Sequence, residues 1–354
     1  MSQVLILGGT GAMGIHLVQL LVNKGIVTFV TSRKHRKSDG NLQYIQGNAH
    51  NIDFIKNILE SNEWDSIVDF MTYNTQTFKE RVDLLLNNTK QYIFLSSARV
   101  YADSEQSITE NSPRLLDASE DNDYLATDEY ALTKARQEDI LKNSGYKNYT
   151  IIRPYITYSE NRLQLGVLEK EDWLYRVLHG RTIVFSEDIC KKITTLTYGY
   201  DVSNAIAELV GNINTQGEIF HITLSEQESC QWQNILDIYV GALERHLGYE
   251  PKVSLRSLND FLNIHSGKYQ ILYDRLFDRY FDNSKIARYV EIDNFMNIKE
   301  GLNKCLEEFL KNPRFKQINW GKQARMDKLC NEKTSLFEIQ GIKQKFEYLF
   351  FRYL

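Results

Sequence analysis

The sequence predicts an α/β protein in which a doubly wound parallel sheet is followed by a smaller, mostly helical C-terminal domain. Three observations predict it. Short apolar runs alternate with helical stretches up to about Tyr155, and a glycine-rich loop follows the first run. After about Tyr155 the alternation becomes irregular and helical stretches predominate. Runs this apolar are typical of strands buried on both faces. Because parallel neighbours need crossover connections, a doubly wound sheet is favoured over a sandwich.

The elements follow in a regular order. Strands are expected at 4–7, 27–32, 42–47, 66–71, 92–97 and 149–154, with helices over 12–23 and 128–141 between them. Residues 201–210 have a helical pattern and residues 218–223 a strand-like one, as in the first half of the chain, so both are expected to return to the first domain. We therefore place a first domain at 1–156 with 198–223 returning to it, a second domain at 157–197 and 224–330, and a tail helix at 331–354.

The tail carries an apolar stripe at helical spacing, formed by Phe346, Leu349, Phe350 and Tyr353. We expect a helix docked on the second domain, with an oligomer contact as the alternative. A membrane-surface anchor is disfavoured, because acidic residues balance the basic ones nearby. These charged residues are Lys343, Lys345, Arg352, Glu338 and Glu347.

Composition restricts the class of protein. The 354 residues suffice for about two domains, and 42% hydrophobic with 25% charged residues is typical of a globular chain. Lys and Arg number 42 against 46 Asp and Glu, a net charge of −4, so a small-molecule partner is favoured over nucleic acid. The four cysteines form no CxxC pair, which predicts reduced thiols and no metal site. Without a signal peptide or a long apolar run, the expected location is cytoplasmic.

Three glycines follow the first predicted strand. Gly8 allows a tight turn, Gly11 lets the backbone approach a pyrophosphate, and Gly14 lets the next helix pack closely on the strand. The start of that helix supplies N–H donors and a positive dipole end. The loop also fits a structural turn, but its place between strand and helix predicts dinucleotide binding. The expected cofactor-binding residues of the loop are Gly8, Thr10, Gly11, Ala12, Met13 and Gly14.

The end of the second strand indicates which dinucleotide is bound. NAD sites carry a carboxylate about 20 residues beyond the glycine loop, whereas here Ser32 is followed by Arg33, Lys34, Arg36 and Lys37. These cations can hold a 2′-phosphate, so NADP is predicted, with NAD possible. A solvated basic loop is the structural alternative.

Two further residues are expected at the cofactor. Asn48, after the third strand, is placed to border the adenine, although asparagine in a turn needs no ligand. Phe70, in the fourth strand run, is the other candidate.

Tyr130 and Lys134 lie four residues apart in the stretch 128–141, so a helix places them on one face. A phenol close to a lysine ammonium is stabilised as phenolate and can exchange a proton with a substrate hydroxyl while a hydride moves to or from the cofactor. Tyr-x-x-x-Lys is easily matched by chance and is weak on its own.

The fifth strand strengthens the interpretation. It ends at Ser97, and hydroxyls at the carboxyl end of a parallel strand face the ligand crevice. Ser97 is therefore expected to bond the reacting oxygen and orient the substrate, unless it only shapes a turn. Tyr101 is either a substrate contact or a packed tyrosine.

In these ordered motifs the chain resembles extended short-chain dehydrogenases/reductases of the NAD-dependent epimerase/dehydratase family. The matching motifs are GGTGAMG, SSARVY, YALTK, IIRPYITY, YGYDV, GEIFHI and FDNSK, which together cover most of residues 1–310. The resemblance implies a Rossmann domain, catalysis by Ser97, Tyr130 and Lys134, and nucleotide-sugar substrates. It adds Arg153 and Pro154 to the cofactor contacts, and it implies a homodimer formed through helices near 75–88 and 126–144.

The chain also departs from the family pattern. Ala98 and Arg99 stand where sugar-nucleotide dehydratases carry an Asp-Glu pair, which disfavours a 4,6-dehydratase. Thr194 stands where many relatives have an arginine for the diphosphate, so Lys191 or Lys192 substitutes or the substrate lacks a diphosphate. The substrate-binding candidates are Tyr101, Tyr158, Arg162, Thr197 and Arg275. Arg162, Arg275 and also Arg279 are candidate anion ligands, but for each of them an ordinary surface charge is the favoured interpretation.

The function predicted from these residues is NADP-dependent oxidoreduction at a sugar hydroxyl or ketone, with reduction of a nucleotide-linked keto-sugar fitting best. An epimerase with a retained cofactor would use the same residues. A non-catalytic dinucleotide-binding or RNA-binding relative is the alternative from another class.

Overall fold

The computed structural model describes residues 2–353, which form two compact units. The first comprises 2–159, Thr195–Glu228 and Tyr280–Ile298, and the second comprises Glu160–Thr194, Ser229–Arg279 and 299–353. The first unit is thus assembled from three segments, one of which, Tyr280–Ile298, the sequence placed in the second domain.

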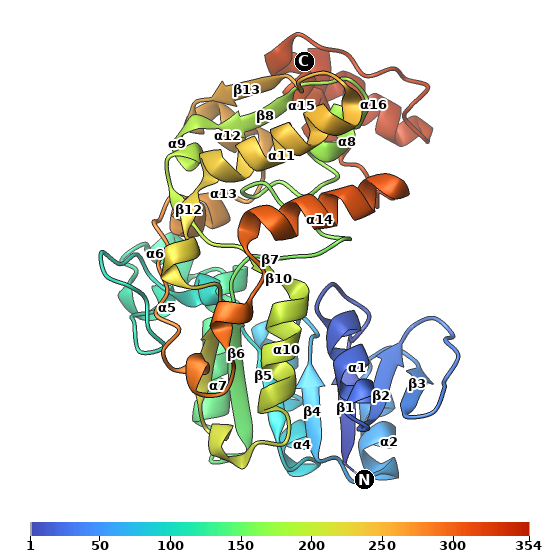
Figure 1. The fold of residues 1–354 in the computed structure, drawn as a ribbon, viewed down its shortest axis with the longest axis vertical. Coiled ribbons are helices and arrows are strands. Elements are labelled where there is room, and N and C mark those ends of the chain that lie inside the picture. Colours follow the sequence, from blue (N-terminus) through green and yellow to red (C-terminus); the bar gives the residue numbers. More distant parts are fainter. Residues whose placement is uncertain (1, 354) are drawn as a thin grey trace. The chain divides into compact units, whose positions relative to one another are not determined.

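The first unit contains a seven-stranded parallel sheet, which confirms the predicted doubly wound α/β fold (Figure 1). The strand order is β11-β6-β5-β4-β1-β2-β3. The strands are β1 (Gln3–Leu7), β2 (Val27–Ser32), β3 (Leu42–Gln46), β4 (Ser66–Asp69), β5 (Tyr92–Leu95), β6 (Tyr149–Pro154) and β11 (Ile219–Ile222). All seven lie within two residues of the bounds expected from their apolar runs, because a strand covered on both faces needs apolar side chains throughout.

The chain changes direction across the sheet at β1. From β1 it proceeds outward to β2 and β3, and it then returns to β4 on the other side of β1, with Leu7 paired in register with Asp69. Connections leaving β1 and β4 in opposite directions open a crevice at the carboxyl ends of these strands, where ligands of open α/β sheets bind.

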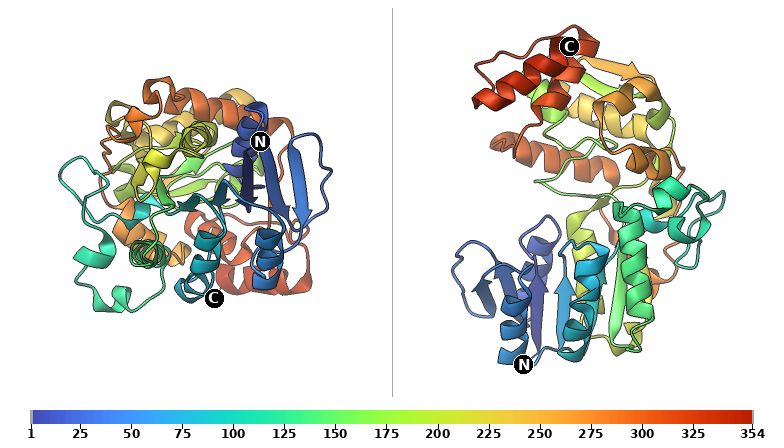
Figure 2. Two further views of the ribbon diagram at one scale, coloured as in Figure 1. Left: turned by 90° about the horizontal axis from the view of Figure 1, so that it is seen from below. Right: turned by 180° about the vertical axis from the view of Figure 1, so that it is seen from behind.

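Helices cover both faces of this sheet (Figure 2). They are α1 (Gly14–Asn23), α2 (Ile52–Ser61), α3 (Thr75–Lys79), α4 (Val82–Asn87), α7 (Tyr130–Lys142) and α10 (Gly199–Leu209). Two short helices of the same unit, α5 (Leu115–Ala118) and α6 (Asn122–Leu125), lie to the side of the sheet (Figure 1), and α5 packs on α7. Helix α1 packs beside α10 on one face. On the other face, apolar residues of α2, α3, α4 and α7 form a buried core with the strands, including Ile58, Leu85, Leu141 and Phe94.

The second unit is mostly helical. Its helices are α8 (Leu174–Leu178), α9 (Glu187–Cys190), α11 (Trp232–Leu247), α12 (Leu258–Ile264), α13 (Lys268–Gln270), α14 (Ile298–Lys311), α15 (Trp320–Cys330) and α16 (Ile342–Tyr353). Its strands form two short pairs, the parallel β8 (Ile183–Ser186) with β13 (Val253–Arg256) and the antiparallel β9 (Ile193–Thr194) with β12 (Cys230–Gln231). Helix α11 is the longest of these, begun by a capping box and ended by Gly248 in the left-handed conformation.

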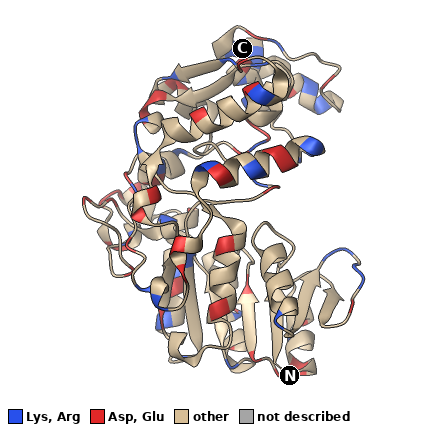
Figure 3. Ribbon diagram, in the orientation of Figure 1, with Lys and Arg blue, Asp and Glu red and all other residues tan. Residues whose placement is uncertain are grey.

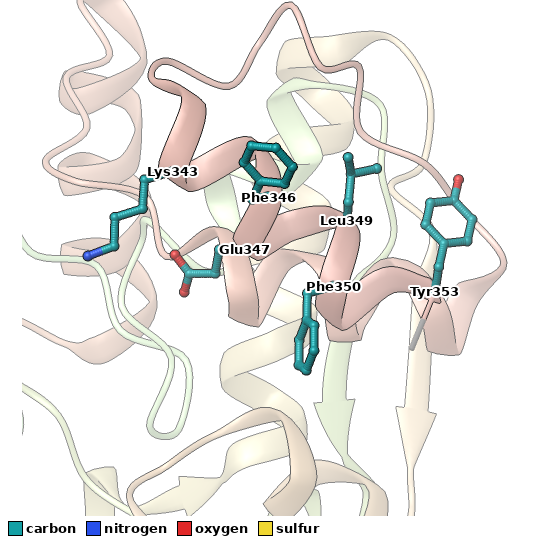
Figure 4. Close-up of a pocket in the computed structure, with 6 residues that line it drawn as sticks. All are labelled: Lys343, Phe346, Glu347, Leu349, Phe350 and Tyr353. Atoms are coloured by element: carbon teal, nitrogen blue, oxygen red, sulfur yellow. The ribbon is translucent and has the colours of Figure 1, made fainter.

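The tail helix α16 docks on α15, and of the stripe that the sequence indicated one residue, Leu349, takes part in the contact. Tyr348 and Phe351 pack toward the cluster around Trp320 and Ala324. The other stripe residues, Phe346, Phe350 and Tyr353, are exposed instead (Figure 4). The reason lies in Tyr348, whose hydroxyl donates to the buried Asp327 (2.7 Å) and accepts the backbone N–H of Thr334 (2.8 Å), because these polar contacts can form only if this face is turned inward.

Candidate active site

The glycine loop joins β1 to α1. Gly8 has a φ of +74°, which only glycine adopts without strain, and its N–H donates to the Thr31 hydroxyl at 3.1 Å. A Cβ on Gly14 would lie 2.6 Å from the Cα of Gly9, so the start of α1 packs directly on the loop. A Cβ on Gly11 would meet nothing within 4 Å. Protein packing therefore does not require glycine at position 11, and the backbone there faces open space beside a helix N-terminus.

Two contacts fix the second half of this loop. The Ser203 hydroxyl of α10 donates to the carbonyl of Met13 at 2.8 Å, and the carbonyl of Gly11 accepts the N–H of Ile15 at 3.1 Å. Thr10 closes the turn by donating its N–H to the carbonyl of Gly8 at 2.8 Å. The loop is therefore preorganised, with Ala12 and Met13 only partly buried at the helix N-terminus.

The loop after β2 is basic and exposed (Figure 3). The Ser32 hydroxyl is buried and engaged locally, because it donates to the carbonyl of Lys34 at 2.8 Å and accepts the Lys34 N–H at 3.3 Å. This turn directs the following side chains outward. The exposed cations are Arg33, Lys34, Arg36 and Lys37, and the guanidinium of Arg36 lies 5.7 Å from the ring centre of Tyr44.

The segments after β3 and β4 lie at the same edge of the sheet. Asn48 is exposed, and its side-chain oxygen accepts the N–H of His50 at 3.1 Å, so it forms a local turn. Phe70 is half-buried and donates its N–H to the carbonyl of Leu7 at 2.9 Å. Arg81, which the sequence did not single out, holds the Asn48 segment by donating to the carbonyls of Ala49 and His50.

Ser97, Tyr130 and Lys134 are brought to one place at the end of β5. Lys134 is buried, and its Nζ donates to the carbonyl of Leu95 at 2.6 Å and lies 6.0 Å from the ring centre of Tyr130. Tyr130 is the first residue of α7 and is 38% exposed, with the Arg99 guanidinium 5.1 Å from its ring centre. Ser97 begins a short 3₁₀ helix, and its hydroxyl accepts the N–H of Arg99 at 3.2 Å.

The electrostatics around Lys134 involve a carboxylate that the sequence analysis missed. Burial lowers the pKa of Lys134 to about 8, while the charges of Asp69 and Glu138 act in the opposite direction. Asp69 ends β4, is buried, and accepts the Tyr92 hydroxyl at 2.9 Å and the Met71 N–H at 2.9 Å. Burial raises its pKa. An aspartate at the end of an otherwise apolar strand was the signal that could have found it.

A buried ion-pair network holds α7 against β5 and β6. Glu138 accepts two bonds from Arg153, at 2.8 Å and 2.6 Å, and the Ser96 hydroxyl at 2.6 Å, while Arg114 approaches it at 3.4 Å. Burial alone would raise the pKa of Glu138, but Arg153 and Ser96 outweigh it and the pKa is lowered. The network sets the position of the helix that carries Tyr130 and Lys134.

The same network contains Arg153, which the sequence analysis assigned to the cofactor. Its side chain is 1% exposed, and its third nitrogen donates to the carbonyl of Glu110 at 3.2 Å. By bonding the Glu138 carboxylate and the Glu110 carbonyl, the buried guanidinium holds α7 and the segment around Glu110 against β6. Pro154, the other expected contact of this strand, is the last residue of β6 and is partly buried.

The three substrate-binding candidates of the first unit are also buried. Tyr101 is the packed tyrosine of the two alternatives, because its hydroxyl bonds His221 Nδ1 at 3.2 Å and the Arg153 guanidinium lies 4.7 Å from its ring centre. Burial raises its pKa. Tyr158 stacks on Tyr198 in a two-stranded pair formed by β7 (Thr157–Tyr158) and β10 (Thr197–Tyr198). The hydroxyl of Thr197 accepts the N–H of Leu224 at 3.1 Å, so it is used within the fold.

The arginine candidates belong to the second unit. Arg162 is partly exposed and pairs with Glu169 at 3.3 Å. Arg275 is buried, pairs with Asp274, and donates to the carbonyl of Gly166 at 3.0 Å, so its charge is compensated inside that unit. The same aspartate pairs with Arg279 at 3.3 Å. Arg275 is thus buried and paired, and not at the surface, where an ordinary charge was the favoured alternative to an anion ligand.

Among residues 2–353 there is no group of three or more His, Cys, Asp or Glu side chains placed to hold a metal ion. No helix in the same stretch of chain is long and apolar enough to cross a membrane.

Comparison with known proteins shows the family to which the chain belongs. The model of the NAD dependent epimerase/dehydratase family matches residues 4–222. The 41 kDa chloroplast stem-loop binding protein b of Arabidopsis thaliana is 27% identical over 238 residues, which are 63% of this chain and 58% of that protein. The UDP-glucose 4-epimerase of Lactobacillus helveticus is 28% identical over 167 residues, 43% of this chain and 50% of that protein. The chain thus spans between half and three fifths of the length of these curated relatives.

Solved structures share the fold over nearly the whole chain. The Bordetella bronchiseptica enzyme WbmH, crystallised with NAD+, has a TM-score of 0.68 and 17% identity, and the match covers 89% of this chain and 100% of that one. The UDP-glucose 4-epimerase of Bifidobacterium longum, crystallised with NAD+ and UDP, has a TM-score of 0.66 and 17% identity, covering 88% of this chain and 99% of that one. At this level of identity the likeness shows the fold.

Proposed function

The chain belongs to the NAD dependent epimerase/dehydratase family, and from this premise we propose that it is a cytoplasmic, NADP-dependent oxidoreductase that reduces the ketone of a nucleotide-linked sugar. One observation carries the proposal: Tyr130 stands exposed at the start of α7, with Lys134 buried one turn behind it and Ser97 at the end of the neighbouring strand. Reduction of a ketone needs a proton donor, a charge that stabilises the donor after it has lost its proton, and a group that orients the ketone oxygen. The phenol, the ammonium and the hydroxyl are suited to these three roles.

The residues that would hold the cofactor are those of the glycine loop. The open space at Gly11 and the N-terminus of α1 fit a pyrophosphate, and the exposed basic loop after β2 fits a 2′-phosphate. When bound, the nicotinamide supplies the hydride. Everything else in the reaction is done by side chains of this chain.

The route of the proton can be derived from the positions of these side chains. Tyr130 donates its phenolic proton to the ketone oxygen as the hydride reaches the carbon, so that the ketone becomes an alcohol and Tyr130 a phenolate. The ammonium of Lys134 stabilises that phenolate, and solvent at the exposed side of Tyr130 returns the proton. Ser97 donates its hydroxyl to the same oxygen and orients the substrate. The bond of Lys134 to the carbonyl of Leu95 keeps the ammonium behind the ring.

The test of catalysis is Tyr130→Phe. Loss of the proton donor is expected to lower kcat for a keto-sugar nucleotide by about 10²- to 10⁴-fold, with little change in NADPH binding. Tyr249→Phe is the matched control, because Tyr249 is similarly exposed but lies in the second unit. Unchanged turnover in Tyr130→Phe would overturn the proposal.

The test of cofactor choice is a titration with NADPH and NADH. In Arg33→Ser/Lys34→Ser the Kd for NADPH is expected to rise by about tenfold or more, since bonds to a charged group contribute about 1.5–3 kcal/mol, while the Kd for NADH stays the same. Lys56→Ser, an exposed lysine on α2, is the control. Equal affinity for both cofactors in the wild type would mean that the basic loop does not select NADP.

An epimerase is the second candidate, favoured by the 28% identity to a UDP-glucose 4-epimerase. Such an enzyme oxidises and re-reduces the same carbon with a retained cofactor. It would therefore turn over nucleotide sugars without added NADPH and release a stoichiometric nicotinamide nucleotide on denaturation. A reductase consumes one NADPH per product and is purified largely without cofactor.

A nucleic-acid function is the third candidate, favoured by the 27% identity to a stem-loop binding protein and by the exposed cations of 33–37. An RNA hairpin that competes with NADPH and binds with a steep salt dependence would support it. Binding of such a hairpin unchanged in Arg33→Ser/Lys34→Ser would exclude this loop as the contact.

A further inference from the structure

Two opposite charges, those of Asp69 and Lys134, are buried in the first unit. Lys134 is 2% exposed and Asp69 is 1% exposed. The Lys134 ammonium bonds the carbonyl of Leu95, whereas the Asp69 carboxylate bonds only uncharged groups. Within residues 2–353, neither side chain forms an ion pair at contact distance. A buried charge is costly unless it is compensated, so each of the two needs an opposite charge nearby.

The strand order places these two charges close together. Asp69 is the last residue of β4 and pairs in register with Phe94 of β5, the neighbouring strand. The Nζ of Lys134 lies 4.6 Å from the ring centre of Phe94 and bonds the carbonyl of the next residue, Leu95. Asp69 lies on this same face of the sheet, since it bonds Tyr92, whose ring stacks with that of Phe94. The carboxylate and the ammonium are therefore neighbours across two adjacent strands, which are about 4.8 Å apart.

The bonds of Asp69 favour its ionised form. Its carboxylate accepts the Met71 N–H at 2.9 Å, the Tyr92 hydroxyl at 2.9 Å and the Tyr73 hydroxyl at 3.4 Å. Burial raises the pKa of both tyrosines well above the usual value, so they remain protonated and donate. Burial also raises the pKa of Asp69, and these three donors together with the charge of Lys134 act against that rise. A carboxylate that accepts three bonds is suited to carry a negative charge.

Glu138 is the other carboxylate near Lys134, but its charge is already paired. It accepts two bonds from Arg153, at 2.8 Å and 2.6 Å, and Arg114 lies 3.4 Å away. Burial lowers the pKa of Lys134 to about 8, and Asp69 opposes this fall more strongly than Glu138 does. Asp69 is therefore the main counter-charge of the ammonium.

Two arginines near the site also have partners of their own. Arg81 lies 4.2 Å from the ring centre of Tyr73, but its guanidinium donates to backbone carbonyls of the segment after β3. Arg99 pairs with Glu129 at 2.6 Å. Both guanidinium groups are thus engaged with other acceptors, which leaves the charge of Asp69 to Lys134.

We propose that Asp69 is a positioning residue, whose carboxylate is the counter-charge that keeps Lys134 an ammonium behind Tyr130. Tyr73 and Tyr92 hold this carboxylate in place. The inference rests on the function proposed above, because the ammonium is what stabilises the Tyr130 phenolate. Asp69 takes no proton from the substrate and acts through Lys134.

The first measurement is the pH dependence of kcat for a keto-sugar nucleotide in the wild type and in Asp69→Asn. Without the counter-charge the pKa of Lys134 is expected to fall by about one unit or more, so the alkaline loss of activity moves to lower pH by the same amount. The two proteins are then expected to differ little at pH 6 and by about fivefold at pH 8, where less of the variant holds an ammonium. A merely structural defect would lower kcat by the same factor at every pH.

The second measurement observes the charge directly and does not depend on catalysis. It is an NMR titration of the lysine Cε resonances of the full chain, in which Lys134→Met identifies the signal of Lys134. In Asp69→Asn the midpoint of this signal is expected about one pH unit or more below that of the wild type. Asp65→Asn is the matched control, because it removes a carboxylate at the opposite end of β4, where Asp65 pairs with Lys90 at 2.8 Å. The control is expected to leave the Lys134 midpoint unchanged.

The reciprocal titration tests the same pair without replacing Asp69, should Asp69→Asn not fold. A coupling between two groups acts equally on both, so Lys134→Met is expected to raise the pKa of the Asp69 carboxyl by about one unit or more. The side-chain carboxyl resonance of Asp69 is followed in the wild type and in Lys134→Met.

Three results would overturn the inference. They are a Lys134 midpoint that is the same in the wild type and Asp69→Asn, an Asp69 carboxyl that Lys134→Met leaves unchanged, and a kcat that falls by one factor at every pH. The proposed function fails in a different way. If both NMR midpoints shift as expected but the wild type turns over no keto-sugar nucleotide, the pairing of Asp69 with Lys134 is supported and the reaction assigned to the site is wrong.

Discussion

Helices α7 and α16 have 13 and 12 residues, and both bury polar side chains. In α7 the buried polar groups lie at the sheet edge, where Lys134 bonds the carbonyl of Leu95 and Gln137 that of Tyr73. In α16 the buried polar groups are Tyr348 and Arg352, which tie the tail to α15 and its following loop, while large apolar side chains remain outside. In both helices, specific polar partners decide which face turns inward. In α7 they also place Tyr130 and Lys134, the residues proposed to be catalytic, whereas in α16 they leave large apolar side chains exposed.

The strongest expected effect is on the network that holds α7. Glu138→Gln keeps the shape of the side chain but leaves Arg153 buried without its carboxylate. Removing one partner of a buried ion pair costs about 3–5 kcal/mol, so the free energy of unfolding is expected to fall by about that amount in urea denaturation.

The control for this change is Asp117→Asn. Asp117 pairs with Arg114 at 2.7 Å but is half-exposed, and surface pairs contribute at most about 1 kcal/mol. If Glu138→Gln were no more destabilising than Asp117→Asn, the network would not be what fixes α7.

A smaller effect is expected where α16 is anchored. Tyr348→Phe removes the hydroxyl that bonds Asp327 and the Thr334 N–H inside the protein, which is expected to cost about 1–3 kcal/mol. The loss is measured as a lower Tm and faster proteolysis of the tail. Tyr353→Phe, on the exposed side, is expected to change neither. Equal behaviour of the two variants would show that the apolar contacts of Phe351 dock the helix without the polar anchor.

The sequence predicted what depends on local pattern. Seven apolar runs became the seven strands, and Gly8, Tyr130 and Lys134 lie at the sheet edge where strand-loop-helix order placed them. Parallel strands buried on both faces leave little freedom in this respect, because each run must be apolar and each crossover must return to the same edge.

The sequence did not predict what depends on distant partners. Glu138 and Arg153 are 15 residues apart, and nothing in the sequence indicated that they pair: Glu138 was not singled out and Arg153 was assigned to the cofactor. Tyr101 and Arg275 carried the residue types of a substrate site, but His221 and Asp274 engage them inside the protein. The stripe of α16 predicted a docked helix but not the face that docks: Leu349 packs on the second unit, whereas Phe346, Phe350 and Tyr353 stay exposed, since the hydroxyl of Tyr348 finds its partners only in the folded second unit.

An effect that appears only as the pH is raised tests the environment of Lys134. Burial lowers the pKa of its ammonium from 10.5 to about 8 in the folded protein, against the attraction of Asp69 and Glu138. The unfolded chain has the ordinary pKa, so between about pH 8 and pH 10.5 the unfolded state holds a proton that the folded state has released. Stability rises with pH wherever the unfolded state binds more protons. The cost of burying the ammonium is thus fully present below pH 8 and is relieved above it.

The measurement is the free energy of unfolding of the wild type and of Lys134→Met over this pH range. Taking the difference cancels the titration of groups common to both proteins. The wild type is expected to gain stability relative to the variant by on the order of 1 kcal/mol per pH unit above pH 8, with no change below it. A difference that stays flat up to pH 10.5 would mean that the bond to the carbonyl of Leu95 and the charges of Asp69 and Glu138 offset burial completely. The ammonium behind Tyr130 would then keep its charge at every working pH, and the activity of the enzyme should show no loss above pH 8 attributable to Lys134.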